Sequence, residues 1–193
     1  LNLYNFMDGI DGIAGIEALT SSLVIGLLFL LVIDNQNIAF LNLLMSAAVI
    51  GFLVWNFPPA KIFMGDAGSG FLGLMIGALV LYSTHVAAQM FWAWLILLGV
   101  FIVDATYTLT RRLIRGDKVY EAHRSHAYQY ASRKYGNHLP VTLAVLVINL
   151  CWLAPWSFAV TLGAIDGALG LLCAYAPLLW LAWYFHAGAL EKT

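Results

Sequence analysis

The sequence contains few charged residues and few cysteines. Lys, Arg, Asp and Glu make up 10% of the chain, whereas about a quarter of a soluble domain is charged. This deficit, together with 62% hydrophobic residues and a mean hydropathy of +0.85, predicts that a lipid bilayer supplies much of the apolar environment. Cys151 and Cys173 lie in apolar runs without CxxC or CxxH spacing, so neither a zinc site nor a disulfide framework is predicted. The net charge of −1 gives no sign of a nucleic-acid partner.

The start of the chain lacks the basic region, short apolar run and cleavage site of a signal peptide. The first residue is Leu1 and not Met, and polar residues that resemble a motif follow at once. We therefore expect the chain to be part of a longer protein, with the N-terminal half upstream.

Six stretches are apolar and long enough, or nearly so, to cross a bilayer, which requires about 20 residues. They are residues 13–33, 38–55, 69–84, 90–108, 139–156 and 167–186. One such stretch could be a buried core helix, but six in one short chain favour transmembrane helices. The sequence therefore predicts an all-α, polytopic bundle that forms a single integral-membrane domain over residues 1–193.

The basic residues of the chain all fall in alternate connections of this arrangement. The connections at 34–37, 85–89 and 157–166 contain no Lys or Arg. The nine basic residues are Lys61, Arg111, Arg112, Arg115, Lys118, Arg124, Arg133, Lys134 and Lys192. The positive-inside rule predicts that their side is the cytoplasmic face of the inner (plasma) membrane. Polar motifs far apart in the sequence would then share one face and could form one site.

The first motif repeats a polar residue at every third position, at Asn2, Asn5, Asp8 and Asp11. Neighbouring members lie on adjacent helical turns, but the period drifts around a helix and the intervening glycines weaken it. We therefore expect a bent or frayed helix end that turns several of these polar groups toward one pocket. Two carboxylates beside a membrane span are costly to bury unpaired, and a divalent cation would relieve that cost. A solvated helix end is the alternative.

The second motif is NFPPAKIFMGDAGSG at residues 56–70, where the two prolines end the preceding helix. Asp66 stands just ahead of the next predicted span, whose start Ser69 could cap. A helix N-terminus carries free N–H groups and partial positive charge, which together with Lys61 favour a phosphate. Asp66 offers the hard oxygen that Mg²⁺ binds together with substrate phosphates. A capped turn between two helices is the alternative.

The third motif is the basic segment 111–126, RRLIRGDKVYEAHRSH. Anchoring to anionic headgroups accounts for part of it. Arg124, flanked by His123 and His126, predicts a contact to an anion or phosphate. Asp104 lies in the fourth predicted span, a turn or two from its end, either as a functional carboxylate or as a partner of Arg111 or Arg112. No role is predicted for the other histidines, which are His85, His138 and His186.

The three motifs, NLYNFMDGIDGIAG, NFPPAKIFMGDAGSGFLG and RR…HRSH, resemble in order and spacing the polyprenyl-phosphate N-acetylhexosamine-1-phosphate transferases. This superfamily is glycosyltransferase family 4, with the MraY and WecA types, and the resemblance covers essentially the whole chain. The HRSH form is more similar to the WecA and WbpL-like branch, which initiates O-antigen synthesis, than to MraY, which has a run of histidines there. The resemblance implies transfer of N-acetylhexosamine-1-phosphate from a UDP-sugar to undecaprenyl (polyprenyl) phosphate with release of UMP.

The resemblance also implies roles for individual residues and a Mg²⁺ cofactor, for which Mn²⁺ is an alternative. The metal ligands would be Asp66 and Asp8. The catalytic positions would be Asp8, Asp11, His123 and His126. The substrate-binding positions would be Asn2, Asn5, Asn56, Lys61, Phe63 and Arg124, with Phe63 stacked on uracil. The adjacent Asp-Asp pair of the superfamily is absent from the sequence, which we attribute to truncation, and a homodimer is left open.

Four other functions compete with this interpretation. The first is MraY-type transfer of phospho-MurNAc-pentapeptide. The second is a CDP-alcohol phosphotransferase, but the DGIDGIAG segment lacks the Arg and the following acidic pair of that class. The third is a transporter or channel, which predicts charged groups near the bilayer midplane, whereas the predicted spans are nearly free of charge. The fourth is a catalytically inactive relative that acts as a scaffold.

Overall fold

The computed structural model describes residues 2–117 and 124–190, and every regular element in these ranges is a helix. The all-α prediction is therefore confirmed. In chain order the elements are α1 (Asn2–Met7), α2 (Ile13–Leu28), η1 (Phe29–Ile33), α3 (Gln36–Asn56), α4 (Gly65–Val86), α5 (Gln89–Leu97), α6 (Gly99–Arg115), α7 (Ala127–Tyr135), α8 (Leu139–Ile148), η2 (Asn149–Leu153), α9 (Ala154–Thr161) and α10 (Gly167–Tyr184), where η marks a short π-helical segment.

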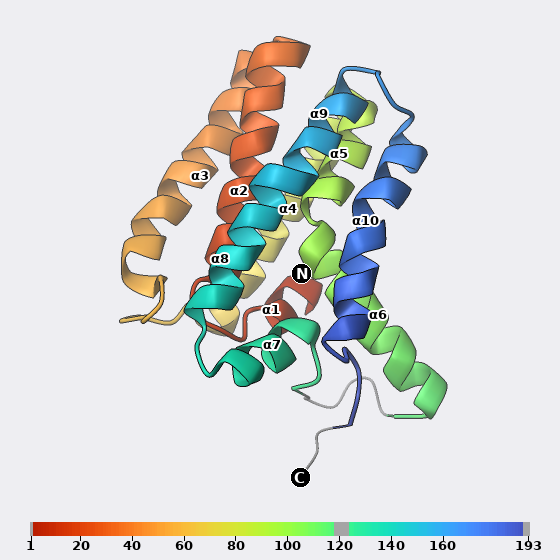
Figure 1. The fold of residues 1–193 in the computed structure, drawn as a ribbon. Helices are drawn as coiled ribbons and strands as arrows, with labels where there is room; N and C mark the ends of the chain where they lie inside the picture. Colours follow the sequence, from red (N-terminus) through yellow and green to blue (C-terminus); the bar gives the residue numbers. More distant parts are fainter. Residues whose placement is uncertain (1, 118–123, 191–193) are drawn as a thin grey trace.

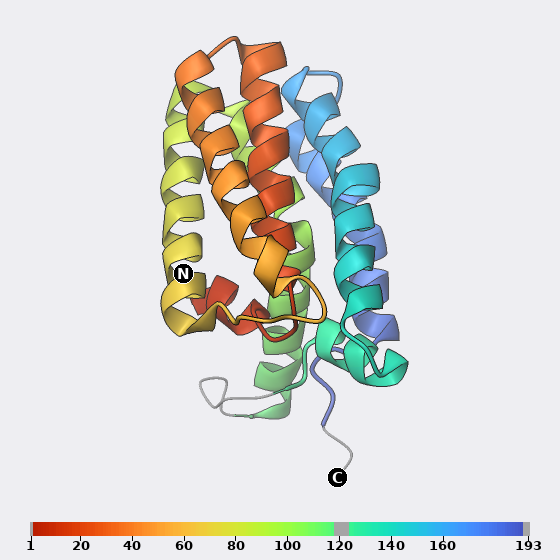
Figure 2. The same cartoon turned by 90° about the vertical axis from the view of Figure 1, so that its left-hand side faces the viewer.

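The long helices form an elongated bundle (Figures 1 and 2). Five helical segments of the described chain are long and apolar enough to cross a membrane. The pair α5 and α6 makes a sixth crossing if it is counted as one broken span. The fourth predicted span is therefore present, but it is not one straight helix. The axes of α5 and α6 differ by 71° at a break beside Leu98.

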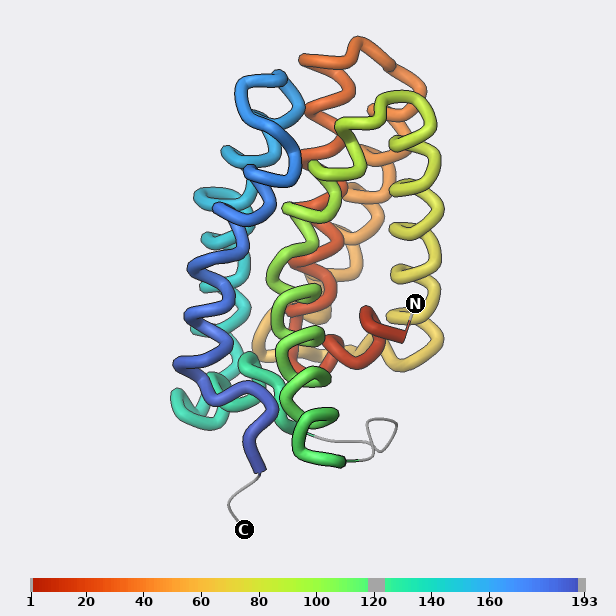
Figure 3. Tube along the Cα trace, turned by 90° about the vertical axis from the view of Figure 1, so that its right-hand side faces the viewer, coloured from red at the N-terminus to blue at the C-terminus, as the bar shows by residue number. Residues whose placement is uncertain are grey.

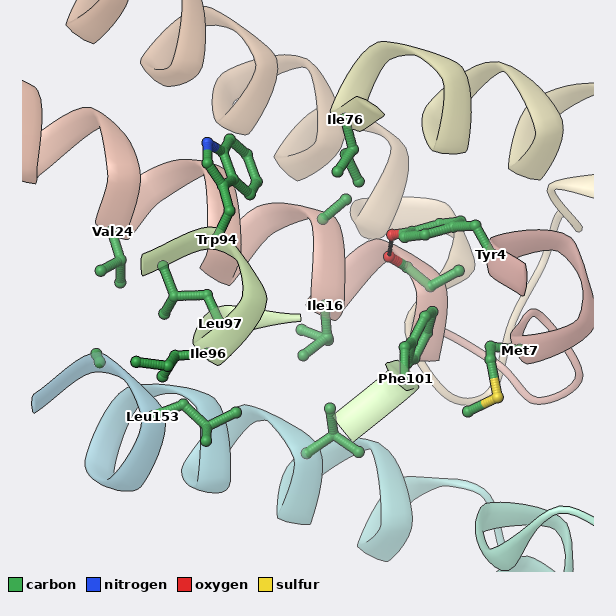
Figure 4. Close-up of a cluster of buried hydrophobic side chains, with 14 of the residues drawn as sticks. Tyr4, Met7, Ile16, Val24, Ile76, Trp94, Ile96, Leu97, Phe101 and Leu153 are labelled. Carbon is green, nitrogen blue, oxygen red and sulfur yellow. Dashed lines mark hydrogen bonds between the residues drawn. The ribbon is translucent and has the colours of Figure 1, made fainter. Parts of the chain in front are cut away.

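Helix α2 packs closely against α3 because two of its glycines leave room for leucines of α3. A Cβ atom on Gly15 would lie 2.6 Å from the nearest carbon of Leu53, and one on Gly26 would lie 2.9 Å from Leu43. Small residues at such contacts let membrane helices approach closely. Figure 4 shows part of the buried apolar cluster, with Trp94 beside α2. Large apolar side chains also cover the outer faces of the helices, as expected for lipid contact.

The short helices α1 and α7 and the loop before α4 lie at one end of the bundle, where α10 also ends (Figures 1 and 3). The basic residues that the structure describes belong to this end, from the loop before α4, the last turns of α6, and α7 with the segment before it. They are Lys61, Arg111, Arg112, Arg115, Arg124, Arg133 and Lys134. Their predicted clustering on one side is confirmed, and we call this part of the molecule the basic end.

Candidate functional site

The N-terminal motif folds as the predicted bent helix end. Helix α1 stops at Met7, and α2 starts after Gly12, whose φ of 74° is favourable for glycine. The hydroxyl of Tyr4 donates to the carbonyl of Ala14 at 2.5 Å, and its ring packs 5.1 Å from that of Phe101. These contacts hold α1 across the basic end, beside the start of α2.

The first and second motifs meet through Asn5. Its side-chain amide donates to Oδ1 of Asp66 at 3.2 Å and to the hydroxyl of Ser69 at 2.9 Å. Burial and then the negative charge of Asp66 raise the pKa of the half-buried Asp8 carboxyl to about 6. Residues about 60 positions apart therefore form one polar cluster, as the sequence predicted.

Helix α4 begins one turn earlier than predicted. Gly65, with a φ of 65°, is its first residue, so Ser69 lies inside the helix and its hydroxyl donates to the Gly65 carbonyl at 3.1 Å. The prediction that Ser69 caps the helix was therefore wrong. Asp66 lies in the first turn of α4 instead, where the helix dipole favours a carboxylate.

The donor atoms near Asp8 and Asp66 fit a magnesium ion that is shared with a ligand. Among the described residues, no group of three or more His, Cys, Asp and Glu side chains could hold a metal by itself. Mg²⁺ usually takes one or two carboxylates and fills its other positions with phosphate oxygens and water. A cation between these two carboxylates would also remove the repulsion that raises the pKa of Asp8. Asp8 and Asp66 are thus the residues that would hold it.

Asp11 does not point toward the same cluster. Its Oδ2 accepts a hydrogen bond from the backbone N–H of Ala60 at 3.1 Å, and its Oδ1 lies 3.2 Å from Nδ1 of His138. The backbone carbonyl of Asp11 also accepts from the Thr142 hydroxyl at 2.7 Å. Asp11 is therefore not one of the polar groups of the first motif that share the cluster, because the turn after α1 directs it toward the start of α8.

Asn56 is buried and joins the first two motifs through backbone groups. Its Oδ1 accepts from the N–H of Gly12 at 3.0 Å, and its Nδ2 donates to the carbonyl of Ile62 at 2.8 Å. Both functions of the amide are occupied by the protein. The structure thus places Asn56, predicted to bind substrate, where it shapes the loop before α4.

The loop between α3 and α4 carries two exposed side chains that are suited to a ligand. The ring of Phe63 is 78% exposed although it is large and apolar. The ammonium group of Lys61 lies 5.4 Å from the ring centre of Trp55. Asn2, at the start of α1, is also exposed. Phe63 and Lys61 thus present an aromatic face and a cation at the basic end, and both are near Asp66 in the sequence.

The third motif is tied to α6 by Asp104. This buried carboxylate accepts from the backbone N–H groups of Ala127 at 2.9 Å and Tyr128 at 3.1 Å. It also lies 3.3 Å from Nδ1 of the buried His126 and accepts from the Thr108 hydroxyl at 3.1 Å. Asp104 therefore caps α7, and His126 is held inside the protein at the start of that helix.

The expected position of Asp104 was wrong, and one of the two alternatives for its role does not hold. Helix α6 continues to Arg115, so Asp104 lies about three turns from its end and not one or two. In the described chain, the partners of its carboxylate lie on α6 and at the start of α7, so the alternative of pairing with Arg111 or Arg112 does not hold. The side chain of Arg111 instead donates to the carbonyl of Ala187 at 3.0 Å, and that of Arg112 lies 3.6 Å from Asp117.

Tyr128 connects the third motif to the first, which the sequence did not indicate. Its hydroxyl donates to the carbonyl of Phe6 at 3.2 Å, and a Cβ atom on Gly9 would lie 2.2 Å from it. Burial raises the pKa of Tyr128, and the negative charges of Asp104 and Asp8 add to this shift. All three motifs therefore meet at the basic end. Only the contact across the folded chain reveals Tyr128, since an isolated tyrosine near HRSH carries no pattern.

Arg124 is exposed and lines a cleft of about 1180 Å³ between α7 and α10. Other residues along this cleft include Tyr130, Arg133, Lys134 and Tyr184, and none comes from α1 or α4. The backbone carbonyl of Arg124 accepts from Arg133 at 3.0 Å. His123, the other predicted catalytic histidine, lies outside the described residues.

Comparison with known proteins supplies the context for this site. The family "Glycosyl transferase family 4" matches residues 1–84. A protein of Bacillus subtilis named probable undecaprenyl-phosphate N-acetylglucosaminyl 1-phosphate transferase is 36% identical over 156 residues, which are 77% of this chain and 41% of that protein. A Thermotoga maritima protein named undecaprenyl-phosphate alpha-N-acetylglucosaminyl 1-phosphate transferase is 30% identical over 160 residues, which are 80% of this chain and 48% of that protein.

A third relative, from Thermosynechococcus vestitus, is named phospho-N-acetylmuramoyl-pentapeptide-transferase. It is 36% identical over 112 residues, which are 58% of this chain and 28% of that protein. The chain thus spans less than half the length of these relatives. No solved structure gives a significant match.

Proposed function

The chain belongs to glycosyl transferase family 4, and from this premise we propose that the whole protein transfers N-acetylhexosamine-1-phosphate from a UDP-sugar to undecaprenyl or another polyprenyl phosphate. One observation carries the proposal. The Asn5 amide bonds to Asp66 beside the Asp8 carboxyl, so two motifs form a polar cluster with two carboxylates at the basic end of a membrane bundle. Such a cluster suits a diphosphate bound together with a divalent metal.

The proposed reaction transfers one phosphoryl group, together with the sugar that it carries, from the UDP-sugar to the lipid phosphate. An oxygen of the lipid phosphate attacks the β-phosphorus of the UDP-sugar, the bond from that phosphorus to the bridging oxygen breaks, and UMP leaves with this oxygen. Positioning and neutralisation of negative charge are the main demands of phosphoryl transfer. When bound, Mg²⁺, or Mn²⁺ in its place, supplies positive charge to the diphosphate.

The chain's own residues have separate tasks in this proposal. The Asn5 amide orients the Asp66 carboxylate through the 3.2 Å hydrogen bond, and Asp8 completes the metal-binding pair. Free N–H groups at the start of α4 and the ammonium group of Lys61 attract phosphate oxygens. The exposed ring of Phe63 offers a stacking surface for uracil. The described contacts give Asp11, Asn56 and His126 a role in holding these segments in place.

An apolar cavity that Tyr128 helps to line suits the lipid acceptor. It has a volume of about 390 Å³, lies between α6, α7, α8 and α10, and is lined mainly by apolar side chains. Tyr128 and Asp104 belong to its lining as well, so this apolar space lies beside the residues that join the third motif to the first. Isoprenyl units could lie there while the phosphate faces the basic end.

We further propose that the basic end faces the cytoplasm, where UDP-sugars are made, and that the protein resides in the inner (plasma) membrane. The branch we propose is the WecA and WbpL-like one, which initiates O-antigen or other envelope glycans. Two relatives are named for N-acetylglucosaminyl transfer and one for the muramoyl-pentapeptide substrate. UDP-GlcNAc is therefore the first donor to test, and the muramoyl substrate is the main alternative.

The test is a UMP-release assay on the full-length protein across a panel of UDP-sugars. We expect release only when the UDP-sugar, polyprenyl phosphate and Mg²⁺ or Mn²⁺ are all present, and loss of release in Asp66→Asn. Release of CMP from a CDP-alcohol, or movement of a solute across vesicles without release of UMP, would instead support one of the rival functions.

A further inference from the structure

A carboxyl group lies inside the first membrane-spanning segment, away from the three motifs. Glu17 is 0% exposed, and its Oε2 accepts a hydrogen bond from the side-chain amide of Asn149 at 2.7 Å. The same amide nitrogen donates to the hydroxyl of Thr20 at 2.8 Å. An ionisable group in a membrane span is expensive to bury and is therefore a functional hypothesis by default. Nothing in the proposed reaction uses it.

Glu17 lies at the break in the fourth span. The first turn of α6 follows this break, and the N–H groups of a first turn have no carbonyl partner within their own helix. The backbone N–H of Phe101, in that turn, is the group of α6 that interacts with the Glu17 carboxyl, without a hydrogen bond of good geometry. In Figure 4, Ile16, the neighbour of Glu17, lies between Leu97 and Phe101, which belong to the two sides of the break. An acidic group from α2 thus lies at the start of α6, where the helix dipole favours it.

The other side of the break is also held by a side chain from a different span. The hydroxyl of Tyr175, on α10, donates to the carbonyl of Leu95 in α5 at 2.6 Å. Gly99 leaves room for this ring, because a Cβ atom there would lie 3.0 Å from Tyr175. At the 71° bend, a side chain of α10 therefore bonds the end of α5, and a carboxyl group of α2 lies at the start of α6.

The fifth span is irregular at the same place. Asn149 is the first residue of the π-helical segment η2, and such bulges are frequent at functional sites. Within the described chain, Oε1 of Glu17 and Oδ1 of Asn149 are buried without a hydrogen-bond partner of good geometry. The break of one span and the bulge of another thus meet at a single carboxyl group.

We propose that Glu17 is a positioning residue that fixes the bend between α5 and α6 and thereby the direction of α6. This direction matters at the basic end because α6 carries Asp104. Asp104 caps α7, and α7 carries Tyr128, which reaches the first motif at Phe6. Glu17 thus acts on the site through α6, at a distance. The consequence for activity rests on the proposed function, but the consequence for the bend does not.

The bend is tested by pulsed EPR on the full-length protein in lipid nanodiscs. Spin labels go on Ile114 at the end of α6 and Leu74 on α4, which are 83% and 58% exposed, after replacement of the native cysteines by serine. Glu17→Leu should broaden or shift the distance distribution between the labels. Glu17→Gln should restore it, since it keeps an oxygen that accepts from Asn149 and faces the start of α6, and adds a donor for the free oxygen of Asn149.

The matched control is Asn42→Leu on α3. Asn42 is equally buried, and its amide donates to the carbonyl of Ile38 in its own helix. An unchanged distribution in Glu17→Leu, or equal broadening in Asn42→Leu, would overturn the proposal. If Glu17→Leu does not fold, Asn149→Leu takes its place, and an unchanged distribution there would overturn the proposal equally.

The UMP-release assay distinguishes a failure of this proposal from a failure of the proposed function. In the UMP-release assay, Glu17→Leu should lower kcat about a hundredfold, because small misplacements of a reacting geometry have effects of that size. The KM for the UDP-sugar should stay nearly constant, since Asn5 and Phe63 are unchanged, and Glu17→Gln should recover the rate. If the wild type releases no UMP, the proposed function fails, while the EPR distances still decide whether Glu17 fixes the bend.

Discussion

Four aspartates associated with the basic end form two groups with opposite surroundings. In the described structure, the Asp8 and Asp66 carboxylates receive one side-chain donor between them, the amide of Asn5. Asp11 and Asp104 instead accept from backbone N–H groups and lie beside His138 and His126. A carboxylate surrounded by protein donors already has its charge balanced, whereas a pair with a single donor between them attracts a cation. The difference separates residues that bind a ligand from residues that hold the site together.

The strongest way to break this comparison is to remove a carboxylate of the first group. Asp66→Asn should lower UMP release by the full-length protein about a thousandfold, as loss of a key electrostatic group does. The melting temperature should hardly change, because Asp66 is exposed and Asn can still accept from Asn5. Full activity in this variant would contradict the assignment of Asp66 to the metal.

A carboxylate of the second group should behave in the opposite way. Asp104→Leu leaves the N–H groups of Ala127 and Tyr128 without their acceptor, so we expect a loss of about 3 kcal/mol in stability. Thermal unfolding in detergent measures this loss. The Mg²⁺ concentration needed for half-maximal residual activity should stay near the wild-type value. A large change in this concentration without a change in stability would place Asp104 in the first group.

The contact between the first and third motifs provides a test of intermediate size. Gly9→Ala places a Cβ atom 2.2 Å from the Tyr128 hydroxyl, so it should destabilise the protein by about 1–3 kcal/mol. Tyr128→Phe in the same chain removes the clashing oxygen and should recover part of the loss. Absence of any recovery in the double variant would show that the hydroxyl of Tyr128 does not lie against Gly9.

The smallest expected effect is at the exposed ring of Phe63. Phe63→Ala should raise the KM for the UDP-sugar about tenfold, since stacking of a base on an aromatic ring is worth about 1–3 kcal/mol. Both kcat and the melting temperature should remain close to wild type, because the ring is largely exposed. Phe63→Trp, which keeps a stacking surface, is the matched control. A fall in kcat with an unchanged KM would argue against a binding role.

The sequence predicted the architecture better than the side-chain directions. The long apolar runs and the placement of the basic residues on one side were enough to predict the helical bundle. Both patterns follow directly from whether a segment contacts lipid or water. The direction of Asp11 could not be predicted, since it depends on the turn between α1 and α2, where Gly12 has a positive φ. The break beside Leu98 has no proline to mark it, and its partners Glu17 and Tyr175 come from other spans.

Single residues without a pattern account for the rest of what the sequence did not show. Tyr128 and His138 contact the first motif only because α7 and α8 fold back onto it. Asp104 was noticed as an intramembrane carboxylate, but its partners are backbone groups, which no sequence pattern displays. Glu17, an acidic residue within an otherwise apolar stretch, could have been noticed by the same signal, but its contact with Asn149 on another span could not.

The difference between the two groups of aspartates is tested most directly by Mn²⁺ binding. EPR measures this binding to the full-length protein in the presence of a UDP-sugar. The assignment of Asp8 and Asp66 predicts that Asp66→Asn weakens Mn²⁺ binding at least about tenfold, the effect of losing one ligand or its support. Asp11→Asn should bind Mn²⁺ as the wild type does, because its carboxylate is occupied by Ala60 and His138. Loss of binding in Asp11→Asn with normal binding in Asp66→Asn would contradict the account.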